Sequence, residues 1–136
     1  MKFTLAKTIV RTLSLQVGDE VDVEEGKSFE KPLFQVFEVT ARYSEEDSKS
    51  FVIVFNLEIN LPELGDQSLQ LEFWAFFEAD QDIDDEFRNS HFPKVNAPAI
   101  AYPYLRSFVT TFLVNAGYSP LYLPTVNFSA ISAQSQ

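Results

Sequence analysis

The residues best suited to chemistry in this chain are three alternating aspartates, Asp80, Asp82 and Asp84. They match the first three ligand positions of a calcium-binding loop. Such a loop then requires Gly at its sixth position and a bidentate Glu at its twelfth, where this chain has Asp85 and His91. The pattern therefore favours a solvated acidic loop, or the first turn of a short helix, which favours acids. We predict no metal site here.

The remaining reactive side chains form no recognisable catalytic set. His91 is the only histidine and there is no cysteine, so a structural zinc site and thiolate chemistry are excluded. No nucleophile motif flanks His91, and the four glycines form no phosphate-binding loop. The sequence predicts a protein that is not an enzyme and that needs no cofactor.

Charge and hydropathy limit the class of partner. The chain has 136 residues and a net charge of -10, which argues for one domain and against nucleic acid as a partner. No apolar run approaches the roughly 20 residues of a membrane span, and the first fifteen residues lack the apolar core of a signal peptide. We therefore expect no membrane insertion and a cytoplasmic location, with which the absence of cysteine is compatible.

The first 80 residues are predicted to form a sheet. Four segments alternate apolar and polar residues with the period of a strand, and an acidic, glycine-containing first connection separates the first two. Short links between the last three segments favour an antiparallel meander. Because strands come first and a helix comes last, the expected class is α+β, with the helix packed on one face of the sheet. The predicted strands are residues 3–15, 33–43, 51–60 and 69–78.

A single helix dominates the second part of the chain. Residues 81–93 read as an acidic loop or short helix, 96–117 as a long helix kinked at Pro103, and 118–136 as an extended tail. At about 100° per residue, the apolar side chains of the long helix cover an arc of roughly 220°, wider than one core requires. We therefore expect a second copy of the protein to cover part of it. The predicted oligomer interface is Ile100, Tyr104, Leu105, Phe108, Val109 and Phe112.

A motif in the last third resembles a known family. Pro-x-Ile-x-aromatic-Pro-Tyr-x-Arg is followed by a helix, a glycine and Pro-Leu-x-Leu-x-x-Val-Asn-Phe, as in the bacterial protein-export chaperone family SecB. The match covers about thirty residues, and the strand order and the long first connection agree with it. The residues that carry it are Pro98, Ile100, Tyr102, Pro103, Tyr104, Arg106, Gly117, Pro120, Leu123, Val126, Asn127 and Phe128.

The resemblance implies a function. SecB-like proteins are ATP-independent chaperones, or holdases, that bind unfolded or pre-export polypeptides in apolar grooves, and they assemble as dimers of dimers. The alternative is an oligomeric protein of the same fold that binds one dedicated partner, such as an antitoxin, without export. The residues expected near the groove are Phe29, Phe34, Trp74, Phe76, Leu121, Tyr122 and Leu123.

The chain departs from the family pattern in two places. Only residues 129–136 follow the Asn-Phe pair, enough for two helical turns at most, so we expect a groove that is more open than in the family or bordered differently. Acidic residues that dock the motor SecA in the family correspond here to the uncharged Thr12, Gln16 and Gln70. Conventional SecA docking is therefore not expected, unless the nearby acids Glu38, Glu58, Glu72 and Glu78 form a shifted patch.

Overall fold

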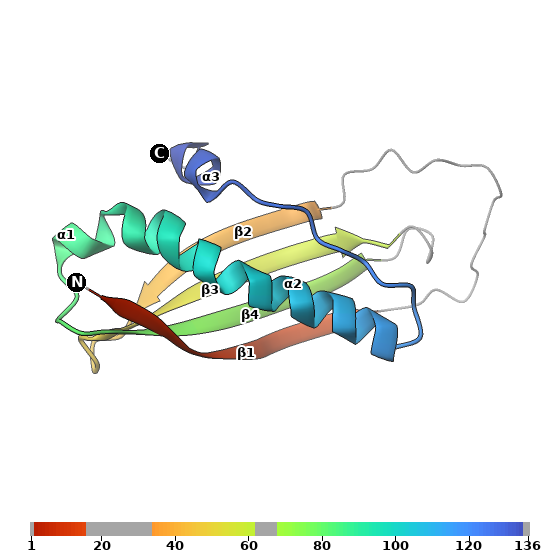
Figure 1. Cartoon of the computed structure of the whole chain (residues 1–136), viewed down its shortest axis with the longest axis horizontal. Helices are drawn as coiled ribbons and strands as arrows, with labels where there is room; N and C mark the ends of the chain where they lie inside the picture. Colours follow the sequence, from red (N-terminus) through yellow and green to blue (C-terminus); the bar gives the residue numbers. More distant parts are fainter. Residues whose placement is uncertain (1, 16–33, 62–67, 135–136) are drawn as a thin grey trace.

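A computed structural model describes residues 2–15, 34–61 and 68–134 of the chain (Figure 1). It is a four-stranded sheet with one long helix lying across one face. The face of the sheet that the long helix covers is called the helix side, and the opposite face is called the outer face. The elements are β1 (Phe3–Leu15), β2 (Phe34–Tyr43), β3 (Ser50–Asn60), β4 (Ser68–Ala79), α1 (Asp85–Arg88), the π-helical turn η2 (Phe92–Asn96), α2 (Ala97–Asn115) and α3 (Phe128–Gln134).

The sheet confirms the predicted α+β class. Its strand order is β1-β4-β3-β2 and all three pairings are antiparallel. The meander comprises β2, β3 and β4, whereas β1 joins at the edge of β4. Alternate residues of β3 and β4 are buried on the helix side, because central strands are flanked on both edges and covered on one face.

Two irregularities change which residues of β1 face the helix. The register against β4 shifts between Leu5 and Lys7 and again between Val10 and Thr12. Each extra residue reverses the alternation beyond it. Ile9, which simple alternation assigns to the buried face, therefore pairs with Trp74 on the outer face and is 37% exposed. Lys7 and Arg11 interrupt the odd-numbered apolar residues of β1, and these bulges explain why: Lys7 pairs with Phe76 on the outer face, and Arg11 lies in the second bulge.

Helix α2 supplies the second layer of the core. Its buried residues recur every three to four positions, as expected for a helix lying on a sheet. Pro103 lies inside the helix, and Gly117 follows its end with φ of +97°, a left-handed conformation that glycine adopts without strain. Among the described residues, no helix is both long and apolar enough to cross a membrane.

The segment after Gly117 runs back along α2 before it ends in α3 (Figure 1). The sequence predicts an extended tail with room for two helical turns at most after the Asn-Phe pair, and Phe128–Gln134 is helical. Asn127 explains the helical start, because its side-chain oxygen accepts a hydrogen bond of 3.1 Å from the Ala130 N–H and so caps the first turn.

Candidate binding surfaces

The three aspartates that imitate a calcium loop each have a structural role. Asp80 accepts a hydrogen bond of 2.9 Å from the Lys2 backbone N–H, and Asp82 one of 2.6 Å from the Ser48 hydroxyl. Asp84 caps α1 by accepting a bond of 2.8 Å from the Phe87 N–H. The Asp80 and Asp82 carboxylates therefore join separate chain segments, and Asp84 caps a helix. No group of potential metal ligands occurs in the described part of the chain.

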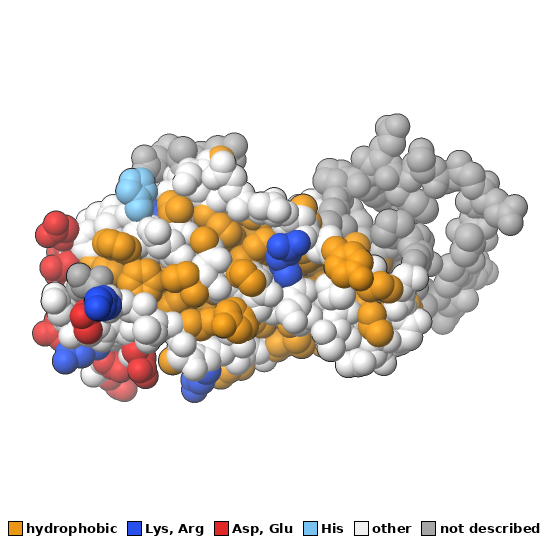
Figure 2. All heavy atoms as spheres, in the orientation of Figure 1, with side chains coloured by type: hydrophobic (Ala, Val, Ile, Leu, Met, Phe, Trp, Pro, Cys, Tyr) orange, Lys and Arg blue, Asp and Glu red, His pale blue; other side chains and the backbone are white. Residues whose placement is uncertain are grey.

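The single histidine stands apart from other reactive groups. His91 is exposed at the start of η2, and its side chain makes no capping hydrogen bond there (Figure 2). Neighbouring Phe92 is 42% exposed and stacks on Phe87, with ring centres 5.9 Å apart.

An apolar ridge runs along α2 on the surface. It consists of Ile100, Tyr104, Phe108 and Phe112, which are four residues apart and so form one row on the helix. Ile100 is 44% exposed and Tyr104 56%, while Phe108 and Phe112 are half-buried and stack with ring centres 5.9 Å apart. Figure 2 shows apolar side chains along this helix, with the acids gathered at the end near α1.

Two residues of the predicted oligomer interface do not lie on that ridge. Leu105 and Val109 are 0% exposed because their row of the helix packs onto the protomer's own sheet. They belong to the core, so only the four ridge residues of the predicted interface remain accessible to a second copy. The apolar arc of α2 is wide because it includes two rows of residues. The row with Leu105 and Val109 packs in the core, and the ridge lies on the surface.

The segment that follows Gly117 is held against α2 by two side chains of the helix. The Thr110 hydroxyl donates a hydrogen bond of 2.7 Å to the Leu121 carbonyl, and the Tyr102 hydroxyl donates one to the Pro124 carbonyl. Burial raises the pKa of Tyr102 to about 12. The neutral phenol, which can donate the bond, is therefore the favoured form.

Between this segment and the helix lies a shallow depression of about 340 Å³. Its walls include Pro103, Ser107 and Thr111 from α2, and Tyr122 from the returning segment. Tyr122 is 72% exposed, an unusual state for a large aromatic side chain. Among the described residues predicted near a groove, it is thus the most accessible.

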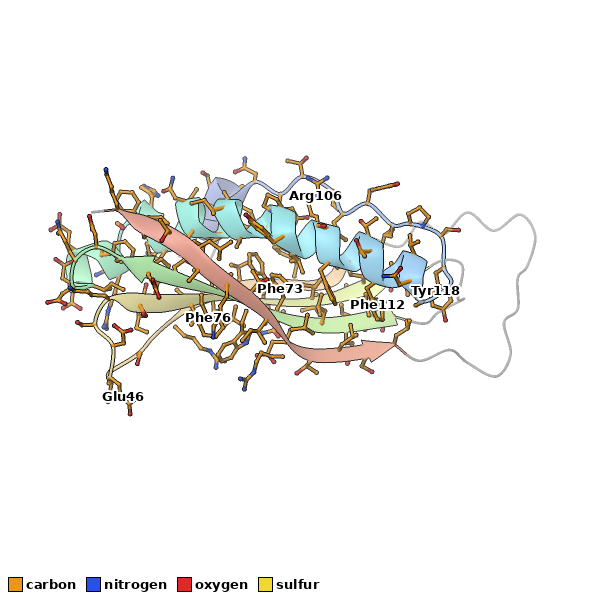
Figure 3. The ribbon with its side chains drawn as sticks, turned by 60° about the horizontal axis from the view of Figure 1, so that its bottom comes forward. Glu46, Phe73, Phe76, Arg106, Phe112 and Tyr118 are labelled. Atoms are coloured by element: carbon orange, nitrogen blue, oxygen red, sulfur yellow. The ribbon has the colours of Figure 1, made fainter. Side chains whose placement is uncertain are left out.

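The other groove residues divide between two faces. On the helix side, Phe34 and Leu121 are partly buried, whereas Leu123 is 1% exposed and therefore a core residue. Phe29 lies outside the described residues. Trp74 and Phe76 are partly buried on the outer face, and Figure 3 shows Phe76 pointing away from α2 while Phe73 lies between sheet and helix.

Positions that correspond to motor-docking acids also lie on the outer face. Thr12 pairs with Glu72, and Gln70 pairs with both Ser14 and Glu58. The neighbouring carboxylates thus lie in the same cross-strand rows as Thr12 and Gln70, around a depression of about 310 Å³. Gln16 lies outside the described residues.

The α2 ridge and Tyr122 expose apolar and aromatic side chains, and exposed apolar surface is typical of an interaction site. The family model for the preprotein translocase subunit SecB matches residues 1–136. The chain therefore belongs to the SecB family, as its C-terminal motif indicated, and this membership supports a chaperone role.

Relatives and solved structures agree with that assignment. An uncharacterized protein of Methanocaldococcus jannaschii, MJ0357, is 30% identical over 97 residues, which cover 68% of this chain and 60% of that protein. The protein-export protein SecB of Thiobacillus denitrificans is 45% identical over 42 residues, or 31% of this chain and 28% of that protein. The matches thus span less than two thirds of either relative.

Two solved structures share the fold. The Mycobacterium tuberculosis Rv1957 SecB-like chaperone, in complex with a ChAD peptide from the Rv1956 HigA1 antitoxin, matches with a TM-score of 0.67 and 16% identity over 91% of this chain and 90% of that one. A Streptococcus agalactiae protein of unknown function matches with a TM-score of 0.59 and 15% identity over 92% of this chain and 98% of that one.

Proposed function

We propose that this protein is an ATP-independent holdase that binds unfolded polypeptides through apolar surface on its helix side. The observation that supports this is the exposure of Tyr122, at 72%, on the helix side of a chain with a net charge of -10. Exposed apolar surface binds non-native segments by area and without sequence rules, while the acidic remainder keeps the protein in solution.

The apolar surface divides into two parts with different roles. The ridge on α2 is a continuous row on a rigid helix, which suits a self-complementary contact with a second copy, as in a two-fold dimer. Two such dimers would give the dimer of dimers expected of the family. Client binding falls to the returning segment and the sheet edge beside it, where Phe34, Leu121 and Tyr122 present aromatic and aliphatic side chains.

The test is suppression of aggregation. Light scattering should show that the protein, without ATP, keeps two unrelated unfolded proteins from aggregating. Tyr122→Ser should weaken this protection, because it removes the most exposed aromatic group of the helix side. Val36→Ser is the matched control, since Val36 is 38% exposed but lies on the outer face opposite Glu58. Equal protection by both variants would contradict the assignment of the client surface.

Selectivity separates this function from its alternative. A holdase protects several unrelated clients, whereas an oligomeric binder for one dedicated partner protects that partner and fails with the others. Protection of a single protein out of a varied set would therefore favour the dedicated binder. A pull-down from the host would then identify that partner.

Docking on the export motor is not part of the proposal. Thr12 and Gln70 carry no charge, and electrostatic docking of a basic tail depends on several carboxylates acting together. Titration with the zinc-binding C-terminal peptide of SecA at low salt should therefore show no micromolar, salt-sensitive binding. Such binding would instead assign Glu38, Glu58 and Glu72 to a shifted docking patch.

A further inference from the structure

The outer face of the sheet carries a band of apolar side chains between cations. One cross-strand row reads Lys7, Phe76, Val52 and Arg42 from β1 to β2, because each residue is paired with the next. The adjacent row places Trp74 at its centre, and Arg11 lies in the second bulge of β1 beside it. The cationic band is defined here as Lys7, Arg11, Arg42, Val52, Trp74 and Phe76.

The cations of the band lie over its aromatic rings. The Lys7 ammonium is 4.9 Å from the ring centre of Phe76, and the guanidinium carbons of Arg11 and Arg42 are 4.5 Å and 5.1 Å from that of Trp74. The ring centres of Trp74 and Phe76 are 6.0 Å apart. Cation–π contacts attract each cation to its ring, and Lys7, Arg11 and Arg42 are nevertheless exposed to solvent.

None of the three cations is neutralised by an ion pair among the described residues, although the chain has twice as many acids as bases, 20 against 10. The nearest acid of the band's centre, Glu72, accepts a hydrogen bond of 2.6 Å from Trp74 Nε1 and so stays beside the ring. The cross-strand rows on either side of the band contain acids. One of these rows holds Glu78, and the other holds Glu72 and Glu38. The positive charge is therefore confined to a narrow band.

The spacing of the band defines the ligand it fits. The backbone positions of Lys7 and Arg42 lie at opposite ends of one row, three strand spacings apart, or about 14 Å at about 4.8 Å per spacing, and their side chains reach inward from there to the rings of Phe76 and Trp74. In an extended peptide, side chains four residues apart point to the same side and are also separated by about 14 Å. An apolar residue midway between them would face Phe76 and Val52. Acids in the neighbouring rows would repel a longer acidic tract.

We propose that the cationic band binds a short extended peptide segment of the pattern acid-x-apolar-x-acid, lying across the strands. One carboxylate pairs with Lys7, the other pairs with Arg42, and the central apolar side chain packs on Phe76 beside Trp74. This surface lies on the opposite side of the sheet from the proposed client surface, so the two sites can be occupied independently. The partner is thus a second class of polypeptide, recognised by its acids.

The experiment uses the blocked peptide Glu-Ser-Phe-Ser-Glu and the intrinsic fluorescence of Trp74, which is the only tryptophan. Titration should give a saturable change in emission that weakens as salt rises. The peptides Gln-Ser-Phe-Ser-Gln and Lys-Ser-Phe-Ser-Lys should bind less well. Lys7→Gln and Arg42→Gln should each weaken binding of the acidic peptide by about two- to fivefold, the range for an exposed charge pair.

Lys94→Gln is the matched control, because Lys94 is an exposed cation on η2, outside the band. It should leave binding unchanged, and thermal unfolding should show that all three variants fold. The proposal is overturned if the three peptides bind alike, if affinity rises with salt, or if the band variants behave like Lys94→Gln. A change in emission on dilution of the protein alone would also overturn it, since a second copy would then cover the band.

Discussion

Removing the exposed part of the α2 ridge should dissociate the proposed dimer and leave the protomer folded. The perturbation is the double variant Ile100→Gln with Tyr104→Gln, because Gln is a good helix former and replaces apolar surface with polar surface. Both residues are about half exposed, at 44% and 56%, so their contribution to the protomer's own core is partial. Their remaining surface is available to a second copy.

The size of the effect follows from the area that remains to be covered. Fully burying a large apolar side chain contributes about 1.5–3 kcal/mol, so covering the exposed half contributes about 1 kcal/mol for each residue. A two-fold interface uses each side chain twice, which gives about 4 kcal/mol for the pair of residues. That corresponds to a dissociation constant raised by about a thousandfold.

The assay is sedimentation velocity over a concentration series, with circular dichroism to confirm the fold. Tyr122→Gln is the control, because Tyr122 is more exposed than either ridge residue but lies outside the helix. It should weaken client binding and leave the assembly intact. A wild-type protein that is monomeric at micromolar concentration, or a ridge variant with an unchanged dissociation constant, would refute the reasoning.

Three further predictions concern the protomer. Up to about pH 10, the stability of Tyr102→Phe should depend on pH in the same way as that of the wild type. Between the ordinary pKa of 10.0 and the raised pKa of about 12, the wild type should lose stability as pH rises, because the phenol of the unfolded chain gives up its proton first. The variant should lose less stability over this range, and urea unfolding measures the difference. Gly117→Ala should cost about 1–2 kcal/mol through its φ of +97° alone, since a Cβ there would meet no atom within 4 Å; thermal unfolding measures this. Asp84→Ala should cost about 1 kcal/mol in urea unfolding by removing the cap of α1, whereas Asp84→Asn should retain most of that stability, because an Asn side chain can accept the same hydrogen bond; equal losses in the two variants would show that capping is not the cause.

The central strands were predictable because their environment is simple. From Phe51 to Ile59 and from Leu69 to Phe77, one face is covered by α2 and the other is partly open, so burial alternates with the sequence. Local pattern and tertiary burial agree there, and the predicted segments lie close to the observed strands. The C-terminal motif supplied the family for a similar reason, since its prolines and glycine are local signals.

Bulges and helix orientation could not be read from the sequence. In β1, the pairing with β4 decides where an extra residue is accommodated, and that pairing joins residues far apart in the chain, such as Ile9 and Trp74. In α2, periodicity defined the width of the apolar arc but not the rotation of the helix about its axis. Packing against the sheet decided that Leu105 is core and Tyr104 is surface.

The contacts that hold the returning segment against α2 could not be predicted from the sequence either. The Tyr102 and Thr110 hydroxyls reach carbonyls 22 and 11 residues further along the chain. Neither partner has a sequence signal, because every residue carries a carbonyl and only the return of the chain selects which one is met. The position of Tyr122, and with it the proposed client surface, depends on these long-range bonds.

The distribution of charge explains why the two faces suit different partners. All 20 acids lie at or before Glu86, so α2 and the segment after it carry no carboxylate, and their one cation, Arg106, lies over the Tyr102 ring at 5.8 Å. A second copy or an unfolded client can therefore cover the helix side without removing carboxylates from water, which would cost several kcal/mol for each unpaired charge. The outer face keeps both signs of charge in adjacent rows, so an apolar partner would have to desolvate them, whereas a partner with matching charges would pair with them. The proposed apolar recognition on one face and the proposed charge-directed recognition on the other thus agree with where the chain places its acids.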